Sequence, residues 1–285
     1  MKEWFRVRFS FLLIAVIMLL GCSHTENEGD QAIVDSSMEV TTNLTSINGI
    51  PIFECYQNND NSKPLLIVQH GLFGNKGDCL PFARKLAEKG YYVIVPDAYG
   101  HGDREGEDPK STIDIIVTSA NEYDSLIAFC IENKNVDSSR IGLIGFSMGG
   151  FMSYYYAAYG KYDIQLIAPS LSTPDWKDMI GIEQTYLRIS TNKKIKITTT
   201  EEKNQINEFI LEHSPIMKKE KLEKIHMLVQ NSVIDPLIPY EGLEDFINEM
   251  SDIAPGFEYQ LYDKTGHEVT EEYYENIIAY LAKYL

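Results

Sequence analysis

The segment Gly145-Phe146-Ser147-Met148-Gly149 constrains the fold of this chain more than any other part of its sequence. It has the pattern G-x-S-x-G, follows the short apolar run 141–144, and leads into a helical pattern. A strand that turns sharply into a helix in this way pushes one serine hydroxyl out of the backbone, and the glycines let strand and helix approach closely. The segment therefore predicts that Ser147 is a nucleophile. A buried serine in a tight turn is the alternative.

Strand-like and helix-like segments alternate on both sides of this turn. Strand-like patterns cover residues 64–69, 91–95, 140–146, 164–168, 225–230 and 257–262, and helical patterns cover 79–89, 112–133, 150–158, 201–211, 240–250 and 270–284. This alternation predicts an α/β fold with a mostly parallel, doubly wound sheet. Residues 38–44 and 50–56 flank Asn48-Gly49 and are expected to form an antiparallel hairpin. Pro51 favours a place for that hairpin at the sheet edge.

The alternation breaks between residues 172 and about 212. This stretch contains Trp176, a polar run over 191–200 and one helical pattern, and it stands between two strand-like segments. Insertions at such a point lie above the carboxyl ends of parallel strands, where open α/β sheets bind ligands. We therefore expect a small lid insertion over about 172–212.

Residues 1–21 have the pattern of a signal peptide. A basic stretch over residues 2–8 precedes an apolar run over 11–20, which is too short to cross a bilayer of about 30 Å as a helix. The run ends in Leu19-Leu20-Gly21-Cys22, which resembles a bacterial lipobox, so Cys22 is expected to be acylated. An uncleaved membrane anchor is the alternative. Both interpretations place the folded part in the cell envelope, outside the cytoplasm and against a membrane.

The remainder of the chain divides into a tether and one domain. Residues 22–37 are polar and acidic without apolar periodicity, which is typical of a flexible tether, and 38–285 are expected to form the domain. The formal net charge of −17 repels phosphate backbones and anionic head groups, which argues against nucleic-acid binding. The lipid rather than the charge would then hold the protein at the membrane.

The remaining cysteines predict neither a metal site nor a disulfide framework. Cys55, Cys79 and Cys130 have spacings that fit no zinc motif, and an odd number cannot be fully paired. Cys79 and Cys130 lie in helical patterns and are expected to be small core residues. No metal and no cofactor are expected.

A serine nucleophile needs a base, and the base needs an orienting acid. His267 follows the last strand-like segment and precedes the last helix, so it should reach the same sheet edge as Ser147. Asp235 follows the preceding strand in a proline-containing loop, which gives the order Ser, Asp, His along the chain. Asp97 also ends a strand and is the rival acid, although capping its own loop is the interpretation we favour.

The other histidines fit structural roles better. His226 is expected to be a buried, hydrogen-bonded imidazole in mid-strand, His213 ends the insertion, and His101 should shape the loop after Asp97. His70 opens the segment His70-Gly71-Leu72-Phe73-Gly74. We expect Leu72 in this segment and Met148 after the nucleophile to supply two backbone N–H groups to an oxyanion hole.

Taken together, these motifs resemble those of serine α/β-hydrolases. They are, in order, His70-Gly71-Leu72-Phe73-Gly74, Pro96-Asp97-Ala98-Tyr99-Gly100-His101-Gly102, the turn at 145–150, Ile234-Asp235-Pro236 and Gly266-His267-Glu268. Residues 45–285 look most like small bacterial carboxylesterases related to dienelactone hydrolase and the prolyl-oligopeptidase catalytic domain. Dienelactone hydrolases proper use a cysteine nucleophile, so their particular chemistry is not implied.

The resemblance implies an α/β-hydrolase fold and hydrolysis of a small-molecule ester through an acyl-enzyme. Phe73, Tyr99 and Trp176 are candidates to line the substrate pocket, with plain packing as the alternative for each. Three other functions remain open: a peptidase of the prolyl-oligopeptidase type, an acyltransferase, and a non-catalytic binding lipoprotein.

Overall fold

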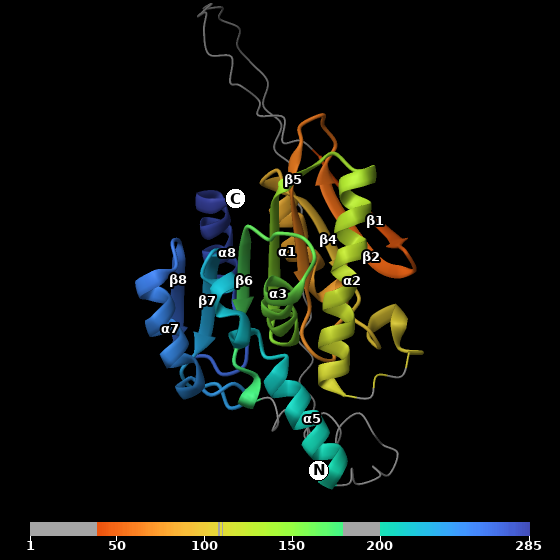
Figure 1. The fold of residues 1–285 in the computed structure, drawn as a ribbon. Coiled ribbons are helices and arrows are strands. Elements are labelled where there is room, and N and C mark those ends of the chain that lie inside the picture. The colour runs from red at the N-terminus through yellow and green to blue at the C-terminus, as the bar shows by residue number, and fades with distance from the viewer. Residues whose placement is uncertain (1–38, 108, 110, 179–199) are drawn as a thin grey trace, which may run out of the picture. The chain divides into compact units, whose positions relative to one another are not determined.

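Eight strands form one sheet in the order β1-β2-β4-β3-β5-β6-β7-β8 (Figure 1). The computed structural model describes residues 39–107, 109, 111–178 and 200–285, all of which lie in the unit Ser37–Leu285. The strands are β1 Val40–Ile47, β2 Ile50–Gln57, β3 Lys63–Gln69, β4 Tyr92–Pro96, β5 Val136–Phe146, β6 Leu166–Ser170, β7 His226–Ser232 and β8 Phe257–Tyr262.

The predicted hairpin is confirmed. β1 and β2 are antiparallel, and Ile47 pairs with Ile50 across a two-residue turn in which Asn48 and Gly49 both have positive φ. The prediction from Pro51 was only half right, because β1 is the edge strand whereas β2 lies between β1 and β4. Pro51 lacks an N–H group, but its carbonyl accepts a hydrogen bond from the Asp97 N–H at 3.0 Å, and this contact joins β2 to the end of β4.

From β3 to β8 the sheet is parallel, as predicted. β4 pairs parallel with β3 and antiparallel with β2, and β2 is in turn antiparallel to β1. β1 therefore runs in the same direction as the parallel strands. The first described strand thus begins on the side of the sheet where the amino ends of the parallel strands lie. The loops that follow the parallel strands lie at the opposite edge, where open α/β sheets bind their ligands.

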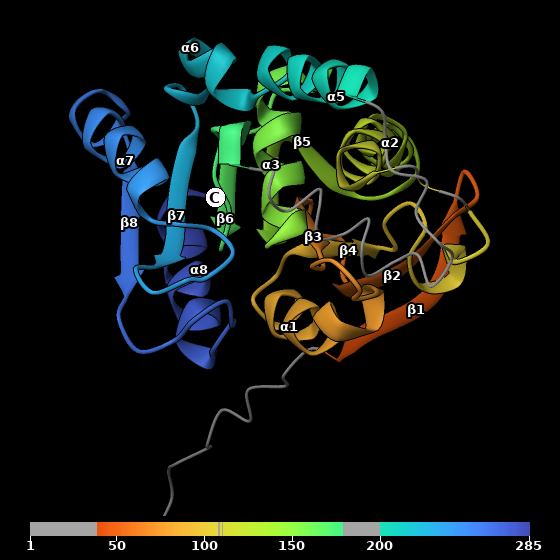
Figure 2. The ribbon, with the colours of Figure 1, turned by 90° about the horizontal axis from the view of Figure 1, so that it is seen from below.

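Helices cover both faces of the sheet (Figure 2). α1 (Lys76–Glu88) and α8 (Glu271–Tyr284) pack on one face, and α2 (Thr112–Asn133), α3 (Met148–Tyr159) and α7 (Glu241–Ile253) pack on the other. Each face has its own cluster of buried apolar side chains. The shorter elements are η1 Gly102–Arg104, η2 Trp176–Asp178, η3 Pro215–Lys218 and α6 Lys219–Leu222.

The insertion is described only at its two ends. The helical pattern predicted there corresponds to α5 (Thr200–Glu212), which lies past the carboxyl ends of the strands (Figure 1). Residues 179–199 lie outside the described residues, as do the predicted signal peptide, Cys22 and the tether up to residue 37. Those interpretations therefore stay predictions.

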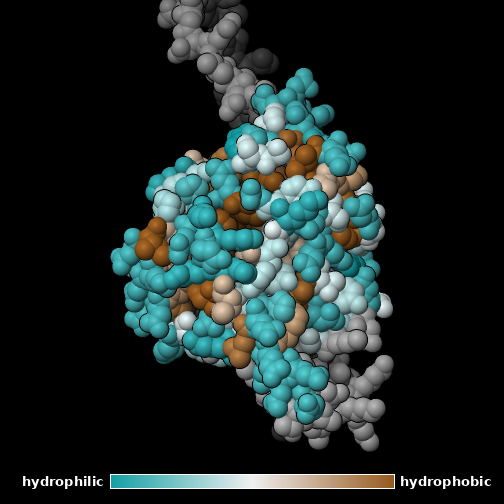
Figure 3. Space-filling model, viewed as in Figure 1, coloured by the Kyte–Doolittle hydropathy of each residue, from teal (hydrophilic) through white to brown (hydrophobic). Residues whose placement is uncertain are grey.

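Hydrophilic residues cover most of the face shown in Figure 3, with smaller apolar areas between them. Within the described ranges, no helix is long and apolar enough to span a bilayer. The thiols of Cys55, Cys79 and Cys130 are free and buried, which confirms Cys79 and Cys130 as core residues. Burial raises the pKa of the Cys79 thiol to about 12, so it stays protonated and unreactive at neutral pH.

Candidate active site

Ser147 occupies a strained turn between β5 and α3. Its φ of 52° and ψ of −114° lie in a region that costs a non-glycine residue on the order of 1–3 kcal/mol, and the Ser147 N–H donates to the Ser170 carbonyl at 2.8 Å. A Cβ atom on Gly145 would lie 1.9 Å from the Gly149 carbonyl oxygen, and one on Gly149 would lie 2.4 Å from the Gln69 carbonyl oxygen. Both positions thus require glycine, as the sequence pattern predicts.

Three loops bring Ser147, His267 and Asp235 into one hydrogen-bonded line. The His267 Nε2 atom lies 2.7 Å from the Ser147 Oγ, and its Nδ1 atom lies 2.7 Å from the Asp235 Oδ2. His267 stands between β8 and α8, and Asp235 follows β7. In the neutral tautomer with a proton on Nδ1, this imidazole donates to the carboxylate and can accept the serine proton at Nε2.

The Asp235 carboxylate is fixed by its own loop. Its Oδ1 accepts hydrogen bonds from the N–H groups of Leu237 at 2.8 Å and Ile238 at 3.0 Å. Burial raises the pKa of the Asp235 carboxyl, but the hydrogen bonds from His267, Ile238 and Leu237 outweigh burial and lower that pKa below its ordinary value. The carboxylate is therefore ionised at neutral pH and oriented toward the imidazole.

The rival acid, Asp97, has a different task. Its oxygens accept from the Lys76 N–H at 2.8 Å, the Lys76 Nζ at 2.6 Å and the Asp103 N–H at 2.9 Å. It is nearly fully buried at the end of β4. The Asp103 contact confirms that Asp97 caps the loop after β4, and the two Lys76 contacts join that loop to the start of α1.

Leu72 and Met148, the residues predicted to supply oxyanion donors, line one cavity with Ser147 and His267. Met148 is the first residue of α3, so its N–H points out of the amino end of that helix. Among the described residues, neither the Leu72 nor the Met148 N–H has a hydrogen-bond acceptor. Both donors are therefore available for an anionic oxygen bound beside Ser147.

The cavity measures about 400 Å³ and has mainly apolar walls. Its lining residues are Gly71, Leu72, Phe73, Thr112, Ile116, Phe146, Ser147, Met148, Phe151, Leu171, Leu237, Ile238, His267 and Val269. Ile116 and Phe151 were not predicted to line a pocket, because their helical periodicity is the same as that of ordinary core residues. The size of the cavity and its apolar walls suit an uncharged substituent of moderate size.

Of the three residues predicted to line the pocket, only Phe73 does so, with 59% of its surface exposed. The prediction is wrong for Trp176, whose side chain is fully buried and stacked on the Tyr155 ring at 5.5 Å. Tyr99 is also absent from the described lining, and its ring lies 5.5 Å from the Arg104 guanidinium. The Trp176 and Tyr99 side chains therefore pack against neighbouring residues of the fold.

Two other histidines lie away from the cavity. His226 is the first residue of β7 rather than a mid-strand residue, and it stacks on Tyr284. Its buried Nδ1 atom has no hydrogen-bond partner among the described residues, so the prediction of a hydrogen-bonded imidazole was wrong. His213 follows α5 and stacks on Phe209.

His70 is buried as a neutral imidazole behind residues 71–74, which form the oxyanion loop that carries the Leu72 N–H. Its Nδ1 donates to the Gly71 carbonyl at 2.8 Å and its Nε2 accepts from the Ala98 N–H at 3.1 Å, an arrangement that requires one proton on the ring. Burial lowers the pKa of His70 to about 4. Protonation would cost the acceptor at Nε2 and place an unpaired charge in the core.

This lowered pKa predicts acid sensitivity of the fold. The unfolded chain binds the proton near pH 6.5 and the folded chain only near pH 4, so the stability that depends on neutral His70 is complete above pH 6.5 and is lost as the pH falls toward 4. We expect the free energy of unfolding to fall by about 2–3 kcal/mol between pH 7 and pH 4.5 from this group. Urea denaturation of the wild type and of His70→Asn at both pH values would measure it. Equal losses in the two proteins would contradict the assignment.

Parts of the chain are similar in sequence to known hydrolases. Residues 53–175 match the model of the Dienelactone hydrolase family. A Bacillus subtilis protein, YitV, provisionally named an esterase, is 28% identical over 210 residues, which cover 70% of this chain and 80% of YitV.

Solved structures show the same fold at lower identity. The acetyl xylan esterase from Paenibacillus sp. R4 superposes with a TM-score of 0.63 at 18% identity, covering 90% of this chain and 87% of that one. Dipeptidyl peptidase 4 from Porphyromonas gingivalis gives 0.65 at 15% identity, covering 86% of this chain but 35% of the peptidase. The fold is that of the α/β-hydrolases. The comparisons support a small serine α/β-hydrolase, and the proteins to which the chain is similar include esterases and the Dienelactone hydrolase family.

Proposed function

We propose that this protein cleaves carboxylic esters through an acyl-enzyme formed on Ser147. The observation that carries the proposal is the line from Asp235 through His267 to Ser147, with 2.7 Å at each step, which opens into an apolar cavity of about 400 Å³. The similarity to YitV and to an acetyl xylan esterase supports ester cleavage as the reaction.

The geometry accounts for both halves of the reaction. The Ser147 Oγ attacks the ester carbonyl carbon while the His267 Nε2 takes its proton, and the carbonyl oxygen becomes an anion that the Leu72 and Met148 N–H groups stabilise. His267 then donates that proton to the departing alkoxide, and the alcohol leaves. Water, deprotonated by the same imidazole, then attacks the acyl carbonyl carbon; the bond to the Ser147 Oγ breaks, His267 returns its proton to that oxygen, and the carboxylic acid leaves. Asp235 holds the tautomer and stabilises the imidazolium that forms in each half.

The walls of the cavity narrow the class of ester. None of the described lining side chains is an acid, a lysine or an arginine, so no fixed charge there would pair with a charged acyl group. Burial of an uncharged chain against Ile116, Phe151 and Leu237 contributes about 0.8 kcal/mol for each CH₂ group. We therefore propose uncharged esters with short to medium acyl chains as the substrates.

A substrate panel tests this proposal. The full chain is expected to hydrolyse p-nitrophenyl acetate, butyrate and octanoate, with kcat/KM falling sharply once the acyl chain exceeds the cavity. It should leave peptide p-nitroanilides intact, whereas a peptidase cleaves both substrate types because activated esters are easy substrates for any serine hydrolase. Turnover of the anilides would establish the peptidase instead. In the presence of added 1-butanol, formation of more butyl ester than free carboxylic acid would establish an acyltransferase.

A further inference from the structure

The peptide bond that carries the Leu72 N–H is held from behind by His70. The carbonyl of that same peptide belongs to Gly71, and it accepts from the His70 Nδ1 at 2.8 Å and from the Gly74 N–H at 3.1 Å. A trans peptide is planar, with its C=O and N–H on opposite sides. Two donors on the Gly71 oxygen therefore set the direction in which the Leu72 N–H points.

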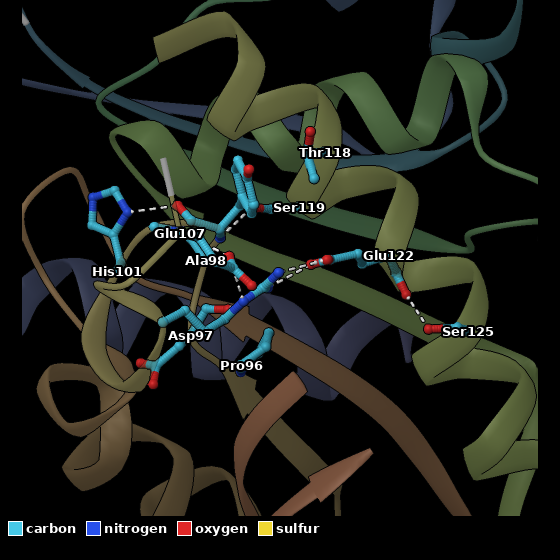
Figure 4. Close-up of polar contacts among 12 residues, drawn as sticks. Pro96, Asp97, Ala98, His101, Glu107, Thr118, Ser119, Glu122 and Ser125 are labelled. Atoms are coloured by element: carbon cyan, nitrogen blue, oxygen red, sulfur yellow. Dashed lines mark hydrogen bonds and ion pairs between the residues drawn. The ribbon is translucent and has the colours of Figure 1, made fainter. Parts of the chain in front are cut away.

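The imidazole is itself locked by the loop after β4. The Ala98 N–H donates to the His70 Nε2 at 3.1 Å, which leaves the ring proton on Nδ1, where it faces the Gly71 carbonyl. That loop is anchored to α2, because the Tyr99 N–H donates to the Ser119 Oγ at 2.8 Å. Figure 4 shows Ala98 beside Asp97 in this loop, with Ser119 and Glu122 approaching from α2.

The next peptide in the oxyanion loop is held by a second histidine. The Phe73 N–H donates to the His101 Nε2 at 3.2 Å, and the His101 Nδ1 lies 3.0 Å from the Tyr99 carbonyl. Phe73 has a φ of 64°, a left-handed conformation that costs an L-residue on the order of 1 kcal/mol. Such strain persists only where surrounding contacts fix the backbone. The turn from Gly71 to Gly74 therefore does not hold its shape unaided.

We propose that His70 is a positioning residue for ester hydrolysis. Its neutral imidazole accepts a hydrogen bond from the Ala98 N–H and donates one to the Gly71 carbonyl. Together these two hydrogen bonds orient the Leu72 N–H toward the oxyanion. His70 touches neither the substrate nor the triad in this role. The inference rests on the proposed function, because it assigns a task within the same reaction.

Asparagine and glutamine separate the two hydrogen bonds of His70. The side-chain amide of His70→Asn reaches the position of Nδ1 and can still donate to the Gly71 carbonyl, but it lacks an acceptor for the Ala98 N–H. The longer side chain of His70→Gln reaches the position of Nε2 and can still accept from Ala98, but it loses the donor to Gly71. If His70 aims the Leu72 N–H, His70→Gln should lower kcat with p-nitrophenyl butyrate by about 10- to 100-fold, and His70→Asn by about threefold or less.

A transition-state analogue distinguishes positioning from general damage. A trifluoromethyl ketone adds reversibly to the Ser147 Oγ and places an anionic oxygen in the oxyanion hole. Its inhibition constant should rise in His70→Gln by the same factor as kcat/KM falls, while KM changes by less than about threefold. His226→Gln, at the amino end of β7, is the matched control and should keep wild-type kcat whatever its melting temperature.

The outcomes separate the positioning role from the proposed function. Equal losses of kcat in His70→Asn and His70→Gln, or wild-type affinity for the ketone in His70→Gln, would overturn the positioning role. If His70→Gln does not fold, the ketone affinity of His70→Asn is the deciding measurement. The positioning role requires that affinity to stay near the wild-type value, and a clear loss of affinity would overturn the role. Absence of ester turnover in the wild type would instead remove the proposed function itself.

Discussion

Ser147→Ala is expected to lower kcat for ester hydrolysis by about 10⁴- to 10⁶-fold, because no other described hydroxyl lies within hydrogen-bond distance of the His267 Nε2. Without the Oγ atom no acyl-enzyme forms, and the oxyanion donors alone leave only a small residual rate. The melting temperature should change little, since alanine keeps the same strained φ and removes only one hydroxyl. Kinetics with p-nitrophenyl butyrate and labelling by a fluorophosphonate, located by mass spectrometry, measure the effect.

Ser153→Ala is the matched control for that experiment. Ser153 lies on α3, the helix that begins directly after Ser147, and its buried hydroxyl donates to the Gly149 carbonyl at 3.0 Å. Loss of this hydroxyl should therefore affect stability more than kcat. Wild-type turnover by Ser147→Ala, or fluorophosphonate labelling of that variant at the same rate as the wild type, would show that another residue is the nucleophile.

Asp235→Asn should lower kcat by about 10³- to 10⁴-fold while KM stays within about threefold of the wild type. The amide retains the volume of the carboxylate, but its NH₂ group donates where the His267 Nδ1–H now donates. The imidazole would then favour the tautomer with its proton on Nε2, which cannot accept the proton of Ser147. The loss of negative charge also removes the stabilisation of the imidazolium.

The pH dependence of this variant provides a second measurement. Hydroxide can replace the lost base, so kcat of Asp235→Asn is expected to keep rising with pH where the wild type has levelled off. Asp263→Asn is the control: this exposed carboxylate follows β8 on the loop that carries His267 and has no hydrogen bond to it within the described part of the chain. Equal effects of the two substitutions would argue against Asp235 as the orienting acid.

The sequence predicted the parts of this site that local chemistry determines. The turn at Ser147 depends on glycines a few residues away, and the loops of Asp235 and His267 directly follow the strand-like segments 225–230 and 257–262. Because parallel strands end at one edge, the order of these residues in the chain was enough to predict that they meet.

Contacts between distant elements could not be predicted in this way. The burial of Trp176 depends on Tyr155, which belongs to another element, and an aromatic residue before an insertion has the same sequence pattern whether it packs or binds substrate. The place of β2 inside the sheet likewise depends on its pairing with β4, which lies about forty residues later and is separated from it by a helix. The hydrogen bonds of His70 depend on the Ala98 N–H, a backbone group that no residue type reveals.

The direction of β1 has a practical consequence for the design of immobilised or fused forms of this enzyme. Val40, the first residue of β1, lies at the amino ends of the parallel strands, whereas the loops that carry Ser147, Asp235 and His267 lie at their carboxyl ends. An affinity tag or solid support attached directly ahead of Val40 should therefore leave the entry of esters into the cavity unhindered. A fusion placed within the loop before α8 would obstruct that entry.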